Sequence, residues 1–487
     1  MSPPALATPT APRSGLRLAL LVSTQFVVAL DYNIVYVALP DIGAGLGFNA
    51  QSLQWVVSSY AVAFGGLLML GGRLVDRVGR RLMFVVGLAL FAASCLAGGL
   101  ATGPAMLLAA RAAQGIGAAM LTPATLSLVN TSFAEGPERT RALSLWSAAG
   151  SAGLAAGALL GGVLTQAGGW RWVMLVMVPP ALVIMLAAPK LLARDGMDRR
   201  TLTGFDLPGA LLATFGSALL VFGLASGPQA GWTSARSIGS VAVGVALLGA
   251  FVVVERRARD PLMPPRLLRA RNLAVAMSVI LIFQSALGGA YYAFTTYLQN
   301  GHGYSALATG LAFLPVTILS VIAGMKIGPA LIRRRGMATS LFTGMLLNGA
   351  GITLLAADME PDASFWTLVP GIAVWGVGGG MTFTAMFVTA ASGVRSGEQG
   401  VASAMATTAQ QLGGAAGLAV LVAVATAGLH SGAGHESSAQ VVAGLRHAGV
   451  VAGVTAMLGA FLAFALKRPP LAAPQSESVF TAEEITL

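Results

Sequence analysis

Three ionisable residues interrupt the long apolar runs of this sequence and are its first candidates for chemistry. Asp31, Arg111 and Lys326 each lie in a run that is long enough to cross a lipid bilayer. A charged side chain at the centre of a bilayer costs about 2.5–3.5 kcal/mol on insertion scales, so each of the three needs a partner or a function. Charges in such places are typical of proton transfer or of binding a charged substrate.

Asp31 and Arg111 are predicted to lie at similar depths. At a rise of about 1.5 Å per residue, Asp31 lies ~13 Å and Arg111 ~9 Å inside the outer ends of their helices. If these helices pack together, a guanidinium and a proton compete for one carboxylate. We therefore expect Asp31 and Arg111 to couple proton movement, with a structural carboxyl and a backbone-bracing Arg as the alternatives. Lys326 lies seven residues before Arg333, which is expected at the inner membrane surface, so the Lys326 side chain can extend to that surface.

The remaining reactive residue types do not form an enzyme signature. None of the three lysines follows a glycine, as a phosphate-binding loop requires, and neither a His-Glu-x-x-His pair nor a Gly-x-Ser-x-Gly elbow is present. The four histidines fall in predicted outer loops or at a helix end. Cys95 is the only cysteine, which excludes an intramolecular disulfide. We expect no enzymatic activity, no metal and no cofactor other than protons as the coupling ion.

The composition predicts a membrane protein. Hydrophobic residues make up 56% of the 487 residues, charged residues make up 10%, and the mean hydropathy is +0.77. Soluble domains carry about 25% charged residues, so secreted, disordered and nucleic-acid-binding classes are excluded. The apolar runs predict an all-α integral membrane protein with fourteen transmembrane helices, at 18–39, 53–72, 82–102, 105–129, 143–166, 172–189, 207–226, 237–254, 273–298, 306–331, 337–357, 365–391, 401–428 and 447–466.

The positions of the basic residues predict the orientation. The formal net charge is +11, and 24 of the 29 Lys and Arg residues fall on one side if the N-terminus is cytoplasmic. Only Arg171, Arg236 and Arg446 fall on the other side. This bias indicates a multi-pass protein of the cytoplasmic (inner) membrane with both termini inside, and not a nucleic-acid partner. The first apolar run is long enough to be a retained helix rather than a cleaved signal.

Short segments recur in the second half of the chain. Residues 47–50 (GFNA) resemble 303–306 (GYSA), and residues 115–120 (GIGAAM) resemble 376–381 (GVGGGM), at offsets of 256 and 261. Near-constant offsets predict two parallel six-helix halves. We expect a cytoplasmic tail at 1–17, a six-helix bundle at 18–189, a linker with two inserted helices at 190–271, a second bundle at 272–466 and a cytoplasmic tail at 467–487.

The second half lacks the charges of the first. The repeat offset places Leu287 at the position equivalent to Asp31 and Ile372 at that of Arg111. One acid among mostly apolar walls suits a lipophilic cation or a neutral amphipathic molecule better than a sugar, an amino acid or a nucleotide. The candidate substrate-binding residues, for which ordinary core packing is the alternative, are Asp31, Gln114, Gln284, Tyr291, Tyr292, Trp375, Met381 and Gln410.

Glycines recur at every fourth position of two predicted helices. One stripe comprises Gly153, Gly157 and Gly161, and the other comprises Gly413 and Gly417. Such stripes let helices approach closely. They suit helices that slide as two bundles move, and equally suit static packing.

Several motifs resemble those of the major facilitator superfamily, and specifically its fourteen-helix drug:proton antiporter branch. Residues 30–40 (LDYNIVYVALP) resemble the first-helix signature of that branch, and residues 72–81 (GRLVDRVGRR) resemble the loop motif between helices 2 and 3. Arg111 with residues 114–117 (QGIG) is similar to the helix 4 motif. The resemblance implies that Asp31 carries a proton, that Arg111 takes part in coupling, and that a cytoplasmic gate is formed by Gly72, Asp76, Arg77, Gly79 and Arg80.

Two positions depart from the pattern of that branch. Its helix 5 antiporter motif normally carries Gly-Pro, whereas here Gly157 is followed by Ala158, and the motif continues to Gly161 and Gly162. In the second half, Arg333 stands where the first loop motif has Asp76, so we expect that copy of the gate to be degenerate.

These features together predict a secondary active transporter: a proton-coupled multidrug exporter that moves antibiotics or biocides by alternating access. Its expected partners are an amphipathic small molecule, protons and the lipid bilayer, with no nucleic acid and a monomer as the functional unit. Two alternatives remain, a proton-coupled importer or facilitator of the same fold and a non-transporting membrane sensor or partner protein.

Overall fold

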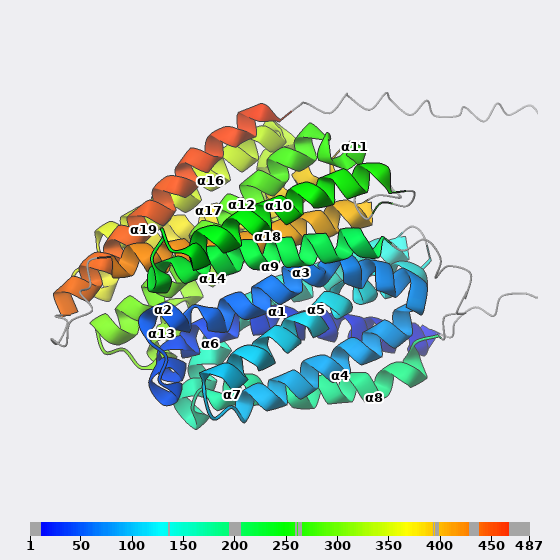
Figure 1. The fold of residues 1–487 in the computed structure, drawn as a ribbon, viewed down its shortest axis with the longest axis horizontal. Coiled ribbons are helices and arrows are strands. Elements are labelled where there is room, and N and C mark those ends of the chain that lie inside the picture. Colours follow the sequence, from blue (N-terminus) through cyan, green and yellow to red (C-terminus); the bar gives the residue numbers. More distant parts are fainter. Residues whose placement is uncertain are drawn as a thin grey trace, which may run out of the picture.

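Long helices run through the whole of the computed structural model, which describes residues 11–134, 137–193, 206–258, 261, 265–392, 394, 399–427 and 438–466. Every regular element in these ranges is helical. The helices lie side by side, and most cross the molecule from one end to the other (Figure 1). The first group comprises α1 (Ala11–Leu46), α2 (Ala50–Leu53), α3 (Trp55–Val78), α4 (Arg80–Gly99), α5 (Pro104–Ser132), α6 (Pro137–Gly168), α7 (Arg171–Leu175) and α8 (Val178–Leu191).

Two long helices and one short one follow, namely α9 (Leu207–Ala230), α10 (Ala235–Arg257) and α11 (Pro265–Leu268). A second group completes the chain. It comprises α12 (Arg271–Thr296) with the π-helical turn η2 (Tyr297–Gly301), α13 (Ala306–Ala312), α14 (Leu314–Ile322), the π-helical turn η3 (Ala323–Ile327), α15 (Gly328–Arg335), α16 (Met337–Ala357), α17 (Phe365–Ala391), α18 (Gln399–Thr426), α19 (Ser438–Ala460) and the short 3-10 helix η5 (Phe461–Ala465).

Eleven helical stretches of the described chain are long and apolar enough to cross a membrane. Three shorter apolar segments, in α3, α6 and α9, correspond to the other three predicted spans. Large apolar side chains are exposed on the outer helices, as lipid contact requires, including Leu186 on α8 and Phe464 in η5. The prediction of an all-helical, multi-pass membrane protein is therefore confirmed.

Contacts within each group of helices are the most extensive. In the first group α1 lies against α6, and α3 and α4 lie against α5; in the second, α16 lies against α17 and α19, and α12 against α18. Helices α9 and α10 pair with each other, and α9 also contacts α3 and α18, which contact each other directly, so α9 packs along the junction of the two groups (Figure 1).

The two glycine stripes lie at two of these contacts, α1 with α6 and α12 with α18. A Cβ atom at Gly157 of α6 would lie 2.8 Å from Cβ of Asn33 and 2.9 Å from the carbonyl oxygen of Leu30 on α1. On α18, a Cβ atom at Gly413 would lie 2.8 Å from Cα of Leu281 on α12. The stripes therefore pack helices tightly within each group.

Substitution in the α6 stripe is expected to destabilise the fold. In Gly157→Val the new side chain has no space against α1, and overpacking of this kind costs about 1–3 kcal/mol. We expect the melting temperature of the purified protein in detergent to fall by several degrees. Gly239→Val on α10 is the control, because a Cβ atom there meets nothing within 4 Å. Equal melting temperatures for the two variants would contradict the packing described here.

The two groups also meet at the end of the molecule remote from Ala11. There Gly162 of α6 faces α13, and a Cβ atom on it would lie 3.2 Å from Cα of Gly310. A Cβ atom at Gly310 would lie 2.9 Å from the carbonyl oxygen of Ala158. The side chain of Gln299 donates a hydrogen bond of 2.9 Å to the carbonyl oxygen of Val37. The antiporter-motif segment of α6 thus contacts the second group at this end.

Candidate functional site

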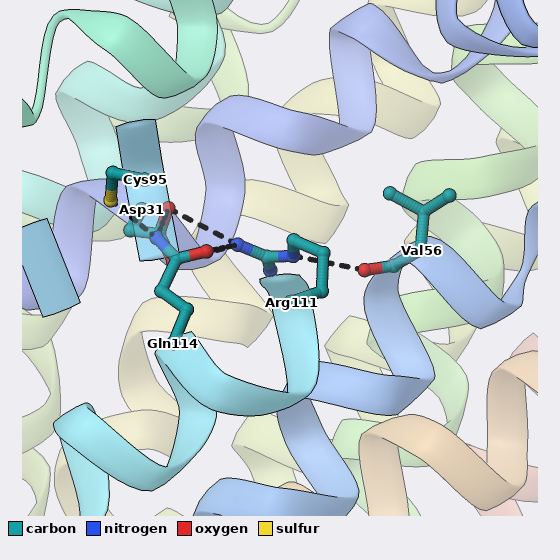
Figure 2. A network of polar contacts seen from close by, with 5 residues as sticks. All are labelled: Asp31, Val56, Cys95, Arg111 and Gln114. Carbon is teal, nitrogen blue, oxygen red and sulfur yellow. Dashed lines mark hydrogen bonds and ion pairs between the residues drawn. The ribbon is translucent and has the colours of Figure 1, made fainter. Parts of the chain in front are cut away.

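Asp31 and Arg111 form a fully buried ion pair (Figure 2). One guanidinium nitrogen, Nη1 of Arg111, donates to Oδ2 of Asp31 at 3.0 Å and to Oδ1 at 3.2 Å. Gln114, one helical turn after Arg111, closes the network: its Oε1 accepts from Arg111 at 2.7 Å, and its Nε2 donates to Oδ1 of Asp31 at 2.8 Å. The predicted pairing of α1 with α5 at matching depths therefore exists in the structure.

Neighbouring helices hold Arg111 in place. Its Nε donates to the carbonyl oxygen of Val56 on α3 at 3.0 Å, and its guanidinium carbon lies 4.4 Å from the ring centre of Tyr60. Gln114 also contacts Sγ of Cys95 on α4 at 3.0 Å. Four helices thus converge on one ion pair, which compensates two charges that would each be costly in the membrane interior. The position of Cys95 within this network has no counterpart in the sequence analysis.

A cavity of about 540 Å³ lies between the two groups of helices. Tyr32 and Asn33 of α1 contribute from the first group, and Gln284, Tyr291 and Trp375 from the second. The other lining residues are mostly apolar or carry neutral polar groups: Ala152, Leu154, Phe283, Leu287, Val316, Thr317, Ser320, Val321, Gly324, Met325, Gly379, Gly380, Phe383, Thr384 and Gln410. None of the described residues that line the cavity is charged.

The cavity gathers half of the predicted substrate residues. Gln284, Tyr291, Trp375 and Gln410 line it, and so does Leu287, the repeat equivalent of Asp31. Tyr292 and Met381 are buried but do not line it, and Asp31 and Gln114 lie in the ion-pair network instead. The sequence did not single out Tyr32 and Asn33 as lining residues, although they occupy the two positions after Asp31. Apart from Tyr36, they are the only polar residues that follow Asp31 in the first-helix motif.

An aromatic cluster closes one end of the cavity. The ring of Tyr291 stacks on Phe313 with centres 4.9 Å apart, and lies 5.5 Å from Trp375 and 5.6 Å from Tyr36. The lining continues from this cluster to Met325 and Thr384, toward the end of the molecule where α1 begins. Such rings can hold planar or apolar molecules by stacking and burial.

The predicted gate residues lie where α3 ends and α4 begins. Gly79 has φ = 110°, a conformation that favours glycine, and it joins the two helices before Arg80. Gly336, between α15 and α16, has φ = 89° and occupies the equivalent turn of the second group. The backbone of Gly72, Asp76 and Arg77 belongs to α3, while the side chains of Asp76 and Arg77 lie outside the described residues. The role of the gate stays a prediction.

The other polar residues noted in the sequence belong neither to the ion-pair network nor to the cavity lining, although Lys326 directly follows Met325 of the lining. Lys326 is exposed in η3, in agreement with a side chain that extends to the surface, and His447 is exposed on α19. His302 contacts the hydroxyl of Tyr297 at 2.7 Å at the end remote from Ala11, and His430 and His435 lie outside the described residues. Among the described residues no group of three or more His, Cys, Asp or Glu side chains could hold a metal ion.

Membrane-spanning helices around a central cavity, with one buried ion pair beside it, define a membrane transporter. Residues 21–418 match the family model of the Major Facilitator Superfamily. The chain belongs to this superfamily, and it is a transporter rather than an enzyme.

Several relatives are named as export or resistance proteins. A cephamycin export protein of Amycolatopsis lactamdurans is 40% identical over 84% of this chain and 85% of its own length. A puromycin resistance protein of Streptomyces alboniger is 38% identical (85% and 82%), and a tetracenomycin C resistance and export protein of Streptomyces glaucescens is 34% identical (84% and 77%).

Solved structures share the fold at low sequence identity. A bacterial homologue of the human lysosomal transporter Spinster superposes with a TM-score of 0.68 at 14% identity, over 93% of this chain and 97% of that one. The peptide transporter PepTSo gives 0.67 at 14% identity, over 94% and 100%. These likenesses confirm the superfamily fold.

Proposed function

We propose that this protein is a proton-coupled exporter of antibiotics or similar amphipathic compounds, with both termini in the cytoplasm. The eleven spans and the three shorter apolar segments supply fourteen crossings. In this arrangement α1–α8 and α12–α19 supply two six-helix bundles, and α9 and α10 are the inserted pair. The bundles move as units about the central cavity.

The buried network of Asp31, Arg111 and Gln114 is the observation that carries the proposal. Arg111 and a proton compete for the same carboxylate, so a change in its surroundings exchanges one for the other. While the ion pair is formed, Asp31 carries a negative charge that the guanidinium of Arg111 balances. When the outward-facing state admits a proton to Asp31, Arg111 is released from it, and this exchange couples proton entry to movement of the bundles. No metal or organic cofactor is needed for such a cycle.

The observed conformation fits the state that receives substrate from the cytoplasm. Contacts of Gly162 with α13, and of Gln299 with Val37, hold the bundles together at the outer end. The aromatic cluster lies between these contacts and the cavity, and the cavity extends from the cluster toward the end of the molecule where α1 begins. A compound entering from the cytoplasm or from the inner leaflet therefore reaches a site that is closed to the outside.

Relatives and cavity together define the class of compound. The relatives are named for cephamycin export, puromycin resistance, and tetracenomycin C resistance and export, and the cavity of about 540 Å³ has aromatic walls and neutral polar groups. A site of this size and lining accepts a drug-sized molecule.

Proton flux in inside-out vesicles tests the proposal. The vesicles are acidified inside, and lipophilic cations, dyes and neutral antibiotics are added from outside. We expect at least one compound to discharge the pH gradient with the wild type and not with vesicles that lack the protein. Uptake driven in the opposite direction in intact cells would favour the importer, and the absence of any compound-dependent flux would contradict transport.

A further inference from the structure

Asn348 is a buried polar residue without a partner. It lies in α16, is 0% exposed, and neither its Nδ2 nor its Oδ1 makes a hydrogen bond. Burying an amide without a partner costs about 1–3 kcal/mol in proteins. Hydroxyl groups of the same region avoid this cost: Thr353 donates to Gly349 O at 2.9 Å, and Thr382 donates to Gly378 O at 2.8 Å. Among the described residues that bury unpaired polar atoms, Asn348 is the only one with two, which makes its amide a candidate for contact with a ligand.

Helix α17, which packs against α16, leaves a small gap beside the amide of Asn348. A Cβ atom at Gly379 of α17 would lie 3.5 Å from Oδ1 of Asn348 and 3.6 Å from Oγ of Ser320, and would meet no other described atom of a neighbouring helix within 4 Å. Two nearby glycines differ, because Cβ atoms on them would meet helix backbone: Gly376 would lie 2.8 Å from Val316 O, and Gly378 would lie 2.5 Å from Leu347 C. Those glycines serve helix packing, whereas Gly379 leaves a gap.

This gap opens onto the central cavity. Gly379 and Ser320 both line the cavity, while no residue of α16 does. The hydroxyl of Ser320 donates to the carbonyl oxygen of Gly376 at 2.9 Å, so its lone pairs remain to accept a hydrogen bond. On α12, another lining residue, Gln284, also has an unpaired amide oxygen.

We propose that Asn348, reached through the gap at Gly379, forms a polar subsite that binds a neutral hydrogen-bonding group of the transported compound, such as an amide or a hydroxyl. The side chain offers two donors and an acceptor, which complement such groups. The subsite deepens the proposed export function and rests on it. Because the described lining residues carry no charge and Asp31 is held by Arg111, the subsite selects neutral polar compounds over permanent cations.

Equilibrium binding to the purified full-length protein in detergent tests the subsite. The two probes are chloramphenicol, a neutral molecule with an amide and hydroxyls, and tetraphenylphosphonium, a permanent cation without hydrogen-bonding groups. We expect Asn348→Leu to weaken chloramphenicol binding about tenfold, as the loss of a hydrogen bond to a buried group implies, and to leave tetraphenylphosphonium binding within twofold. Thr353→Val is the matched control, since it removes a hydroxyl from the same helix that bonds only within that helix.

A second variant, Gly379→Ala, tests the subsite even if Asn348→Leu does not fold. Gly379→Ala places a methyl group in the gap at ordinary contact distances, so it is expected to fold normally and to show the same selective loss. The subsite is wrong if the variants lose affinity for chloramphenicol and tetraphenylphosphonium equally. It is also wrong if neither variant loses affinity for chloramphenicol.

Wild-type behaviour separates the subsite from the proposed function. If the wild type binds no chloramphenicol yet couples tetraphenylphosphonium to proton flux, the subsite is wrong and export stands. If neither probe binds and none of the tested compounds moves protons, the proposed function fails with it.

Discussion

Substrate-driven proton flux is expected to fall at least about 100-fold in Asp31→Asn, because an amide cannot take up and release the proton. The replacement has nearly the shape of the original side chain, and its oxygen can still accept from Arg111 and Gln114. Asp31 does not line the cavity, so we expect binding of the transported compound to stay within about threefold of wild type, whereas export against a gradient stops. Flux in acidified inside-out vesicles and equilibrium binding in detergent measure the two effects separately.

Asp41→Asn is the control for this experiment. It makes the same chemical change in the same helix, at an exposed position ten residues further along α1. We expect proton flux in this variant to equal that of the wild type. If Asp31→Asn still exports at the wild-type rate under a proton gradient, Asp31 is not the proton carrier and the coupling scheme is wrong.

Removing the cation alone is expected to be worse for stability than removing both charges. Arg111→Gln leaves the Asp31 carboxylate buried and without a cation, and breaking a buried pair in this way costs about 3–5 kcal/mol. The double variant Asp31→Asn with Arg111→Gln leaves only neutral groups, which can still form hydrogen bonds with Gln114. We therefore expect the melting temperature to fall steeply in Arg111→Gln and to recover most of the loss in the double variant, while coupled transport stays absent in both.

Thermal unfolding in detergent measures this cycle, with Arg446→Gln as the exposed control on α19. An additive result, in which the double variant is less stable than either single variant, would mean that the two side chains act independently. That outcome would contradict the ion pair as the element that compensates both charges.

Much of the architecture could be predicted from the sequence, because lipid restricts the choices. Backbone groups in the membrane must be paired internally, so apolar runs of about 20 residues have to be helices. Charge is rare in the predicted spans: Asp31, Arg111 and Lys326 are their only Asp, Glu, Lys or Arg residues. Asp31 and Arg111 were therefore the natural candidates for the site, and the structure joins them at 3.0 Å. The roles of Tyr292, Met381 and the gate residues stay predictions.

The class of the chain, its apolar helices and the identity of the intramembrane charges could be predicted from the residues alone, since these depend on local hydropathy and on the cost of burying charge. Which neutral residues meet could not, because it depends on how distant helices pack. Leu287 and Gly379 carry no chemical signal of their own, yet both line the cavity, and the unpaired amide of Asn348 lies behind one of them. The physical reason is that a cavity is made by distant helices that fail to fill a space, and such a failure is a property of packing between helices rather than of residue type.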